Sequence, residues 1–259
     1  MTLRPVTLPA TLAAGKAELD RLRPLSGRSL EALSAWYDVE LTFSSNAIEG
    51  STLTRSETAI ILEKGITVGG KPLRDHLAAV DHRDALHFVR QLGGRAEPVR
   101  EADAREIHRL VVLRADPNDA GRYSQHQRQI VGSPLVLPSP AEILPLMGDF
   151  GQWLATVAVT PDAAFTAHAR LVTIHPFSDG NGRTARLLMN LLLLKAGYPP
   201  VVIGPEQRTG YIDGLQSLQL GGDPGPYRDF MAARLGASLD HHLAMLTRGL
   251  DQPTAAARS

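Results

Sequence analysis

Residues 175–186 read His-Pro-Phe-Ser-Asp-Gly-Asn-Gly-Arg-Thr-Ala-Arg and lie between two strongly apolar helical patterns. Pro176 cannot continue the preceding helix, so we expect His175 at a helix end, facing a loop. Gly180 and Gly182 allow unusual backbone dihedrals and close approach of a ligand. The next helix begins here with unpaired amides, an arrangement that is typical of an anion-binding site.

Charged side chains in the same stretch indicate which anion would bind. Arg183 and Arg186 are three residues apart and so share one face of the first helical turn. Positive side chains there oppose the helix dipole unless an anion lies between them, and a di- or triphosphate meets this requirement. Asp179 is the one carboxylate of the loop and, beside phosphate oxygens, would hold Mg²⁺. His175 supplies a base whose ordinary pKa of about 6.5 is close to neutral pH.

Each of these features has an ordinary structural interpretation when it is taken alone. A Gly-Asn-Gly turn between helices, a capping aspartate and two solvated arginines would need no functional explanation. Together they place a base, a metal carboxylate, an anion site and two phosphate-binding side chains within one short stretch. The combination favours a functional site over packing.

Outward from this stretch, most of the chain has apolar residues at three- and four-residue spacing, which predicts an all-α protein. Thr54 and Glu57 have the spacing of a capping box, and Gly65 suits the end of the helix that follows. We predict the other helices at about residues 30–49, 73–92, 101–114, 140–158, 162–174, 183–196, 208–220 and 226–249. Residues 116–139 do not show this helical spacing. They contain two short β-prone segments surrounded by Gly, Asn and Pro, which predicts a surface hairpin.

Composition excludes several classes of function. The 27 basic and 27 acidic residues give a formal charge of zero, which disfavours a general attraction to nucleic acid or to an anionic membrane. The chain has no cysteine, so disulfides and thiol chemistry are excluded. No signal peptide or long apolar run is evident, and we expect a soluble, cytoplasmic protein. DNA binding is also disfavoured, because little chain follows the last predicted helices.

Residues 175–186 resemble the Fic family, whose signature is HxFx(D/E)GNGRxxR, and every specified position of that signature is present. The resemblance extends over about residues 30–235 and implies the Fic fold, a bundle of about eight to ten helices with a β-hairpin flap. It divides the chain into an N-terminal helical region with an inhibitory helix (1–100), a core domain (101–235) and a C-terminal helix and tail (236–259).

The resemblance implies an adenylyltransferase that uses ATP and Mg²⁺ to attach AMP to a Ser, Thr or Tyr hydroxyl of a protein. His175 would deprotonate the hydroxyl, and Asp179 would bind the Mg²⁺ that bridges the α- and β-phosphates. Arg183 would neutralise the β-phosphate and Arg186 would fix the γ-phosphate. Gly180, Asn181 and Gly182 would bind phosphate oxygens, and Phe177 would anchor the loop in the core. Glycine at position 182 favours transfer of AMP over phosphorylation.

A second resemblance lies upstream, where Ser45, Glu49 and Gly50 fill the places of the family's inhibitory motif, (S/T)xxxE(G/N). Ser45 and Glu49 are four residues apart and therefore share a helical face. The resemblance implies that Glu49 pairs with Arg186 and occupies the group that should hold the γ-phosphate. Taken alone, the motif could be an ordinary helix end with a glycine cap.

The hairpin region resembles the family's flap, which pairs with an extended segment of the target, and our candidates for that edge are Ile130, Val131 and Gly132. Relatives often have a basic residue at the position that Ser124 occupies in this chain. Whether the flap contacts a target at this position therefore remains open. Tyr211 corresponds to an aromatic residue near the adenine ring, although a structural tyrosine fits this position nearly as well.

Three other functions remain open at this point. The same pocket could remove AMP from a modified protein, it could transfer phosphate, or the fold could serve a non-catalytic toxin-antitoxin module. The intact His175 and both arginines disfavour the last of these. Self-modification and a homodimer also remain open.

Overall fold

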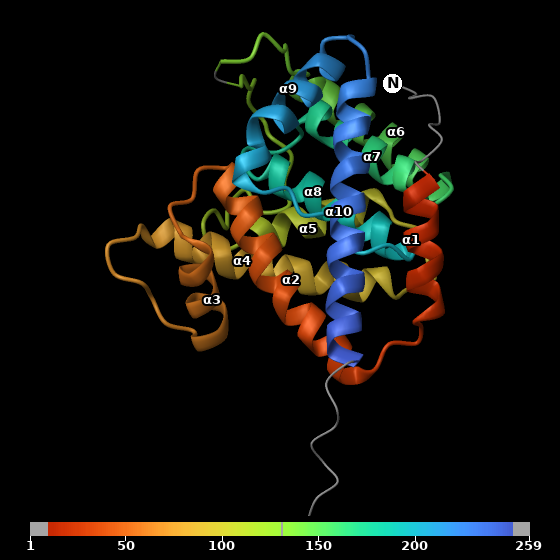
Figure 1. Cartoon of the computed structure of the whole chain (residues 1–259). Helices are drawn as coiled ribbons and strands as arrows, with labels where there is room; N and C mark the ends of the chain where they lie inside the picture. Colours follow the sequence, from red (N-terminus) through yellow and green to blue (C-terminus); the bar gives the residue numbers. More distant parts are fainter. Residues whose placement is uncertain (1–9, 131, 251–259) are drawn as a thin grey trace, which may run out of the picture.

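The computed structural model describes residues 10–130 and 132–250, and in these ranges it contains ten α-helices and no strand (Figure 1). The all-helical prediction is therefore confirmed. The helices are α1 (Ala10–Arg21), α2 (Gly27–Ile48), α3 (Arg55–Lys64), α4 (Leu73–Gly93), α5 (Glu101–Val112), α6 (Pro140–Thr156), α7 (Pro161–Ile174), α8 (Asn181–Lys195), α9 (Arg208–Gln219) and α10 (Gly225–Leu250), with a short 3₁₀ turn at Pro205–Gln207.

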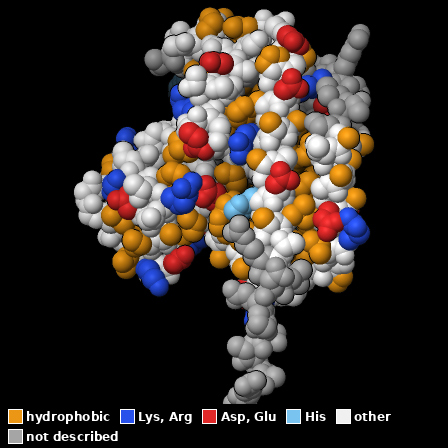
Figure 2. All heavy atoms as spheres, in the orientation of Figure 1, with side chains coloured by type: hydrophobic (Ala, Val, Ile, Leu, Met, Phe, Trp, Pro, Cys, Tyr) orange, Lys and Arg blue, Asp and Glu red, His pale blue; other side chains and the backbone are white. Residues whose placement is uncertain are grey.

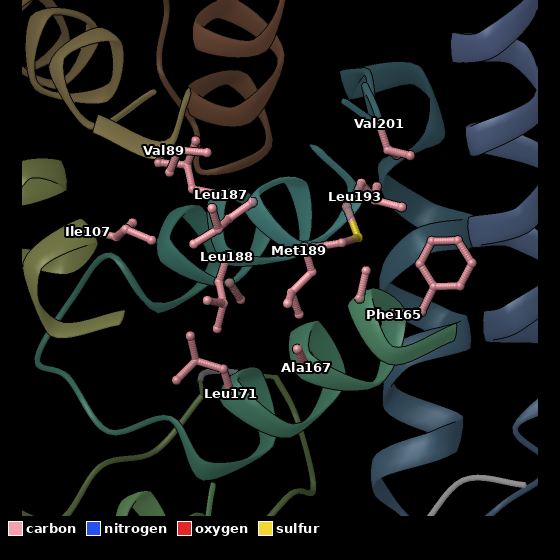
Figure 3. Packing of buried hydrophobic residues seen from close by; sticks show 14 of the residues in the cluster. Val89, Ile107, Phe165, Ala167, Leu171, Leu187, Leu188, Met189, Leu193 and Val201 are labelled. Atoms are coloured by element: carbon pink, nitrogen blue, oxygen red, sulfur yellow. The ribbon is translucent and has the colours of Figure 1, made fainter. Parts of the chain in front are cut away.

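The core is built around α7 and α8, which pack against each other on either side of the 175–180 loop. All leucines of α8 except Leu194 are buried, and Leu188 lies between the two helices close to Leu171 of α7 (Figure 3). On the far side of α8, Leu187 faces Val89 of α4 and Ile107 of α5. Because apolar side chains cover most of its circumference, α8 can occupy the centre of the bundle. The loop before it is thereby fixed to the best-packed part of the molecule.

Local sequence signals fix the ends of several helices. Thr54 and Glu57 form the predicted capping box at the start of α3, and Gly65 ends that helix in the left-handed conformation with φ 66°. At the start of α7, the Thr160 side chain accepts a hydrogen bond from the Ala163 amide. These capping interactions satisfy backbone groups that the helices cannot satisfy internally.

The structure differs from the sequence-based expectation at both ends of the chain. Helix α1 was not predicted; it buries Leu12 and Leu19 and packs against α10. The predicted boundary at 235/236 falls inside α10, which continues without interruption. One core cluster contains buried residues of all three predicted regions, from Leu12 to Leu246, because α1 and α10 close over the same hydrophobic interior.

Acidic and basic side chains are interspersed on the face shown in Figure 2, which agrees with the zero formal charge of the chain. Among the described helices, none has both the length and the hydropathy that a membrane span requires.

Candidate active site

The active-site loop, residues 175–180, joins the end of α7 to the start of α8. His175 ends α7 in the left-handed conformation with φ 51°, and its amide donates to the Leu171 carbonyl at 2.9 Å. Gly180 precedes α8 with φ 73°, and a Cβ at this position would lie 2.9 Å from Val112 Cγ1. Only glycine tolerates both the dihedral and the contact without strain. The backbone therefore places the amides of the first turn of α8 at the loop, as an anion site requires.

Phe177 and Asn181 hold this loop in place. Phe177 is fully buried, as expected, and stacks on the His108 ring with centroids 3.7 Å apart. The Asn181 side chain accepts from the Phe177 amide at 3.0 Å and donates to the Phe177 carbonyl at 2.9 Å. Both ends of the Asn181 amide group are thus used within the loop, and one N–H of its side-chain NH2 group remains beside its backbone N–H.

His108 of α5 connects the loop to the segment that follows α5. Its Nδ1 accepts a hydrogen bond from the Gly121 amide at 3.0 Å, so Nε2 carries the proton and donates to the Asp179 carbonyl at 3.0 Å. Burial, with the nearby charge of Arg183, lowers the pKa of His108 to about 4 despite the opposing hydrogen bond to Asp179. The ring is therefore neutral near pH 7 and keeps this donor and acceptor pattern.

His175 has the geometry of a general base. Its Nδ1 lies 3.3 Å from the Val172 carbonyl, to which it donates, and this leaves the lone pair on Nε2. Burial lowers the pKa of His175 below its ordinary value, and Arg128 acts in the same direction. The imidazole is consequently unprotonated near pH 7 and can accept a proton.

Arg183 and Asp179 form an ion pair at the mouth of the site, with Arg183 Nη2 at 2.9 Å from Asp179 Oδ2. The arginine side chain is 8% exposed, whereas that of Asp179 is 79% exposed. The aspartate can therefore reach a ligand in solvent, and the arginine is held in a fixed direction beside the start of α8. Within the described residues, no group of three or more carboxylate or imidazole side chains could hold a metal ion by itself.

Arg186 is buried and contacts the end of α2. Its Nε donates to Ser45 Oγ at 3.0 Å, and Nη2 donates to the Ser45 carbonyl at 3.0 Å and to Glu49 Oε1 at 2.7 Å. The guanidinium is thus held by two residues of the upstream motif, Ser45 and Glu49. Burial alone would lower the pKa of Arg186, but Glu49 and Tyr211 outweigh it and the pKa is raised. In this structure, Glu49 and Ser45 therefore occupy the Nε and Nη2 donors of Arg186.

A chain of buried hydrogen bonds continues from Arg186 into the core. Tyr227 Oη donates to the Phe165 carbonyl at 2.9 Å, so it accepts from His168 Nδ1 at 2.7 Å. His168 Nε2 must then accept from Tyr211 Oη at 2.7 Å, and Tyr211 Oη in turn lies 3.5 Å from Arg186 Nη1. Tyr211 is 2% exposed, so its ring is enclosed rather than open for stacking on an adenine. Of the two interpretations that the sequence left open for Tyr211, this geometry favours the structural one.

The segment after Glu49 is fixed by side chains of other helices. Gly50 has φ 93°, which redirects the chain after the end of α2. Arg208 Nε donates to the Ile48 carbonyl at 3.0 Å, and Asp75 accepts from the Thr52 amide at 2.7 Å. The position of Glu49 is therefore set by tertiary contacts and not by α2 alone.

The flap region has one isolated antiparallel bridge, between Gln129 and Val136. Between them, the Ser133 amide donates to the Ile130 carbonyl at 3.1 Å, and Gly132 has φ 79°. The described residues Ile130 and Gly132 therefore lie in a tight turn rather than in an extended edge, because the left-handed glycine favours a turn. Val131, the third residue of the predicted edge, lies outside the described residues.

Two residues near the site were not identified from the sequence: His108 and Arg128. Arg128 Nη1 donates to Ser124 Oγ at 3.0 Å, and Nη2 donates to the Phe177 carbonyl. This contact places a basic side chain beside Ser124. A signal for His108 was available, since it interrupts an apolar helical face, but that pattern also fits ordinary packing.

Comparison with known proteins agrees with this geometry. The model of the Fic/DOC family matches residues 98–193. The chain is 39% identical over 210 residues to a protein adenylyltransferase Fic of Nematostella vectensis and 35% identical over 211 residues to protein adenylyltransferase fic-1 of Caenorhabditis elegans. Each alignment covers 79% of this chain, but only 48% and 41% of the respective relative, so the chain spans about half the length of these curated relatives or less.

Solved structures show the same arrangement of helices. A fragment of Fic-1 from C. elegans superimposes with a TM-score of 0.81 and 31% identity, over 92% of this chain and 72% of that one. A Fic domain containing signaling protein from Bacteroides thetaiotaomicron superimposes with a TM-score of 0.83 and 26% identity, over 92% of this chain and 97% of that one. With the signature loop, the buried arginine and these relatives in agreement, the chain belongs to the Fic/DOC family.

Proposed function

We propose that this chain transfers the AMP moiety of ATP to a hydroxyl group of a protein. The observation that carries the proposal is the conjunction of an unprotonated His175 with Arg183, Arg186 and the start of α8 around one loop. The adenylyltransferase names of the aligned relatives support the same reaction. Because those relatives are longer than this chain, their activity is part of the proposal.

The transfer joins the hydroxyl oxygen of the target to the α-phosphorus of ATP and breaks the bond between that phosphorus and the α,β-bridging oxygen. Pyrophosphate leaves, and the hydroxyl proton moves to His175 Nε2, the nitrogen that does not donate to Val172. Such an in-line displacement depends on positioning and charge stabilisation more than on covalent help from the protein. Arg183 and Arg186 supply that charge beside the helix start.

The residues present fit a magnesium ion that arrives with the nucleotide. Mg²⁺ in nucleotide sites is usually held by one or two carboxylates together with phosphate oxygens and water. Asp179 offers one exposed carboxylate at the loop, with one oxygen engaged by Arg183. A bound Mg²⁺ would neutralise charge on the α- and β-phosphates, and Asp179 would orient it.

We also propose that Glu49 inhibits the reaction by holding Arg186. The carboxylate contacts the guanidinium at 2.7 Å, and Ser45 occupies two further donors of the same group. An Arg–carboxylate pair that is partly screened from water competes with a phosphate for the same donors. ATP would then bind without its γ-phosphate on Arg186, in a pose that is unsuited to transfer.

The test uses ATP labelled on the α-phosphate, with the wild type, Glu49→Gly and His175→Ala. We expect strong labelling of protein by Glu49→Gly, weak labelling by the wild type and none by His175→Ala. A parallel reaction with label on the γ-phosphate serves as the control for phosphorylation. Label that arrives only from the γ-phosphate would replace AMP transfer with phosphate transfer, and equal labelling by all three variants would overturn the proposal.

A further inference from the structure

A second cavity lies away from the active-site loop, between the first half of α2, the loop before it, α4 and the segment that follows α8. Its volume is about 670 Å³, within the range of cavities that bind small organic molecules. It reaches α8 at Leu194, close to the end opposite the active-site loop. On α2 it reaches Tyr37, eight residues before Ser45, or about 12 Å along the helix.

The walls of the cavity are mainly apolar. They are formed by Pro24, Leu25, Leu30, Leu33, Leu194, Tyr198, Pro199 and Pro200. The remaining lining residues are polar or basic, namely Arg23, Arg90, Ser34, Tyr37 and His242. Among the described residues that line the cavity, none is acidic. A ligand that fits it would therefore have a large apolar part and a small group that accepts hydrogen bonds or carries negative charge.

The two arginines are held in place mainly by carboxylates that do not line the cavity. Arg90 donates to Asp38 at 2.6 Å and to the Ser34 carbonyl at 3.1 Å. Arg23 donates to Asp20 at 3.0 Å and to the Gly197 carbonyl at 2.8 Å. These bonds use the Nη1 and Nη2 atoms, and among the described residues neither Nε–H group has a hydrogen-bond acceptor. Each guanidinium thus keeps donors for an anionic group while its side chain is already ordered, which lowers the entropic cost of binding.

His242 adds a polar group that is neutral near pH 7. Its Nδ1 lies 3.3 Å from Tyr37 Oη, and burial, with a contribution from the charge of Arg23, lowers its pKa to about 4. The positive character of the lining therefore comes from the two arginines. We infer that this cavity binds a small apolar carboxylic acid, with the carboxylate toward Arg23 and Arg90 and the aliphatic part against the leucine and proline walls.

This site does not depend on the proposed adenylyl transfer, and its test needs no enzymatic activity. Wild-type protein is titrated calorimetrically with decanoate, at concentrations where the acid is monomeric, and in parallel with decanol. We expect saturable binding of decanoate with one site per chain, and binding of decanol weaker by about tenfold or more, as loss of a charge-assisted pair implies. Equal binding of the acid and the alcohol would overturn recognition of the carboxylate, and binding of neither would overturn the site.

A pair of matched variants locates the binding. Leu30 is 49% exposed at the cavity, whereas Leu220, at the end of α9, is 54% exposed and does not line it. Leu30→Glu places a negative charge beside the ligand and should weaken decanoate binding by about tenfold or more, while Leu220→Glu should leave it unchanged. Because both leucines are half exposed, both variants should fold, and thermal denaturation checks this. Equal effects of the two variants would show that the acid binds elsewhere.

Discussion

Replacing Glu49 should make the protein distinguish ATP from ADP. The two nucleotides differ by the γ-phosphate, for which Arg186 is the proposed partner. In the structure, Arg186 Nη2 donates to Glu49 Oε1 at 2.7 Å, so the wild type should bind ATP and ADP with similar affinity. In Glu49→Gly the Arg186 guanidinium no longer contacts a carboxylate and can bind the γ-phosphate. Because ADP has no γ-phosphate, only ATP should bind more tightly.

The size of the effect follows from the environment of the pair. A hydrogen bond to a charged group contributes about 1.5–3 kcal/mol. The Arg186 side chain is 7% exposed but that of Glu49 is 42% exposed, so solvent screening places the contact near the lower end of this range. About 1.4 kcal/mol corresponds to a tenfold change in affinity. We therefore expect Glu49→Gly to bind ATP about tenfold more tightly than ADP, and Glu49→Gln to lie between it and the wild type.

The measurement is calorimetric titration with Mg-ATP and Mg-ADP, in a His175→Ala background that prevents turnover. Glu40→Gln is the matched control, since Glu40 lies on the same helix and pairs with Arg55 rather than with Arg186. It should behave as the parent does. If Glu49→Gly bound both nucleotides equally well, Arg186 would not hold the γ-phosphate and the explanation of inhibition would be wrong.

Three further predictions concern the histidines and their partners. Tyr211→Phe leaves His168 Nε2 without a hydrogen-bond donor, which should lower the unfolding free energy, measured by urea titration, by about 1–3 kcal/mol. Combined with Glu49→Gly, Tyr211→Phe should also reduce the preference for ATP over ADP. Tyr227→Phe should lower stability but leave that preference unchanged. Because burial lowers the pKa of His175, the transfer rate should be constant above about pH 6.5 and fall only below it, and an apparent pKa above 6.5 would contradict the base assignment. Burial lowers the pKa of His168, and that of His82, to about 3, so below about pH 6.5 the unfolded chain takes up protons that the folded chain does not. The unfolding free energy should therefore decrease as the pH is lowered, by up to about 1.4 kcal/mol per pH unit for each histidine. An unfolding free energy that does not change between about pH 7 and 5 would refute this prediction.

The parts of the fold that the sequence predicts are those whose signals are local. Helix α3 carries its capping box and its terminal glycine in the chain itself, and the position of His175 follows from the proline after it. Helix α1 was missed because its two buried leucines have a hydrophobic partner only when α10, more than 200 residues later, packs against them. The hydrogen bond from the Ser133 amide to the Ile130 carbonyl was not predicted, since a β-prone run next to glycine fits an extended edge as well as a turn.

The candidate site also contains some residues that the sequence predicts and others that only the structure places there. Its contiguous residues, from His175 to Arg186, are evident in the sequence because the chemistry lies within one turn and one loop. Arg128 and His168 reach the site through contacts with Phe177 and Tyr211, 49 and 43 residues away, and nothing in their local pattern separates them from surface or packing residues. Tertiary structure, rather than a motif, gives them their place.

Gly182 connects the catalytic loop to its proposed inhibitor. A Cβ at this position would lie 2.4 Å from Glu49 Oε1 and 3.1 Å from Arg186 Nη1, closer than carbon and oxygen can approach. A side chain at residue 182 would therefore force the Glu49 carboxylate to shift from its observed position on Arg186. The absence of a side chain also leaves room for an anion at the start of α8. A larger residue would displace the carboxylate and narrow the anion site at once. Residue 182 therefore affects two features at the same time, the observed contact between Glu49 and Arg186 and the proposed anion site at the helix start.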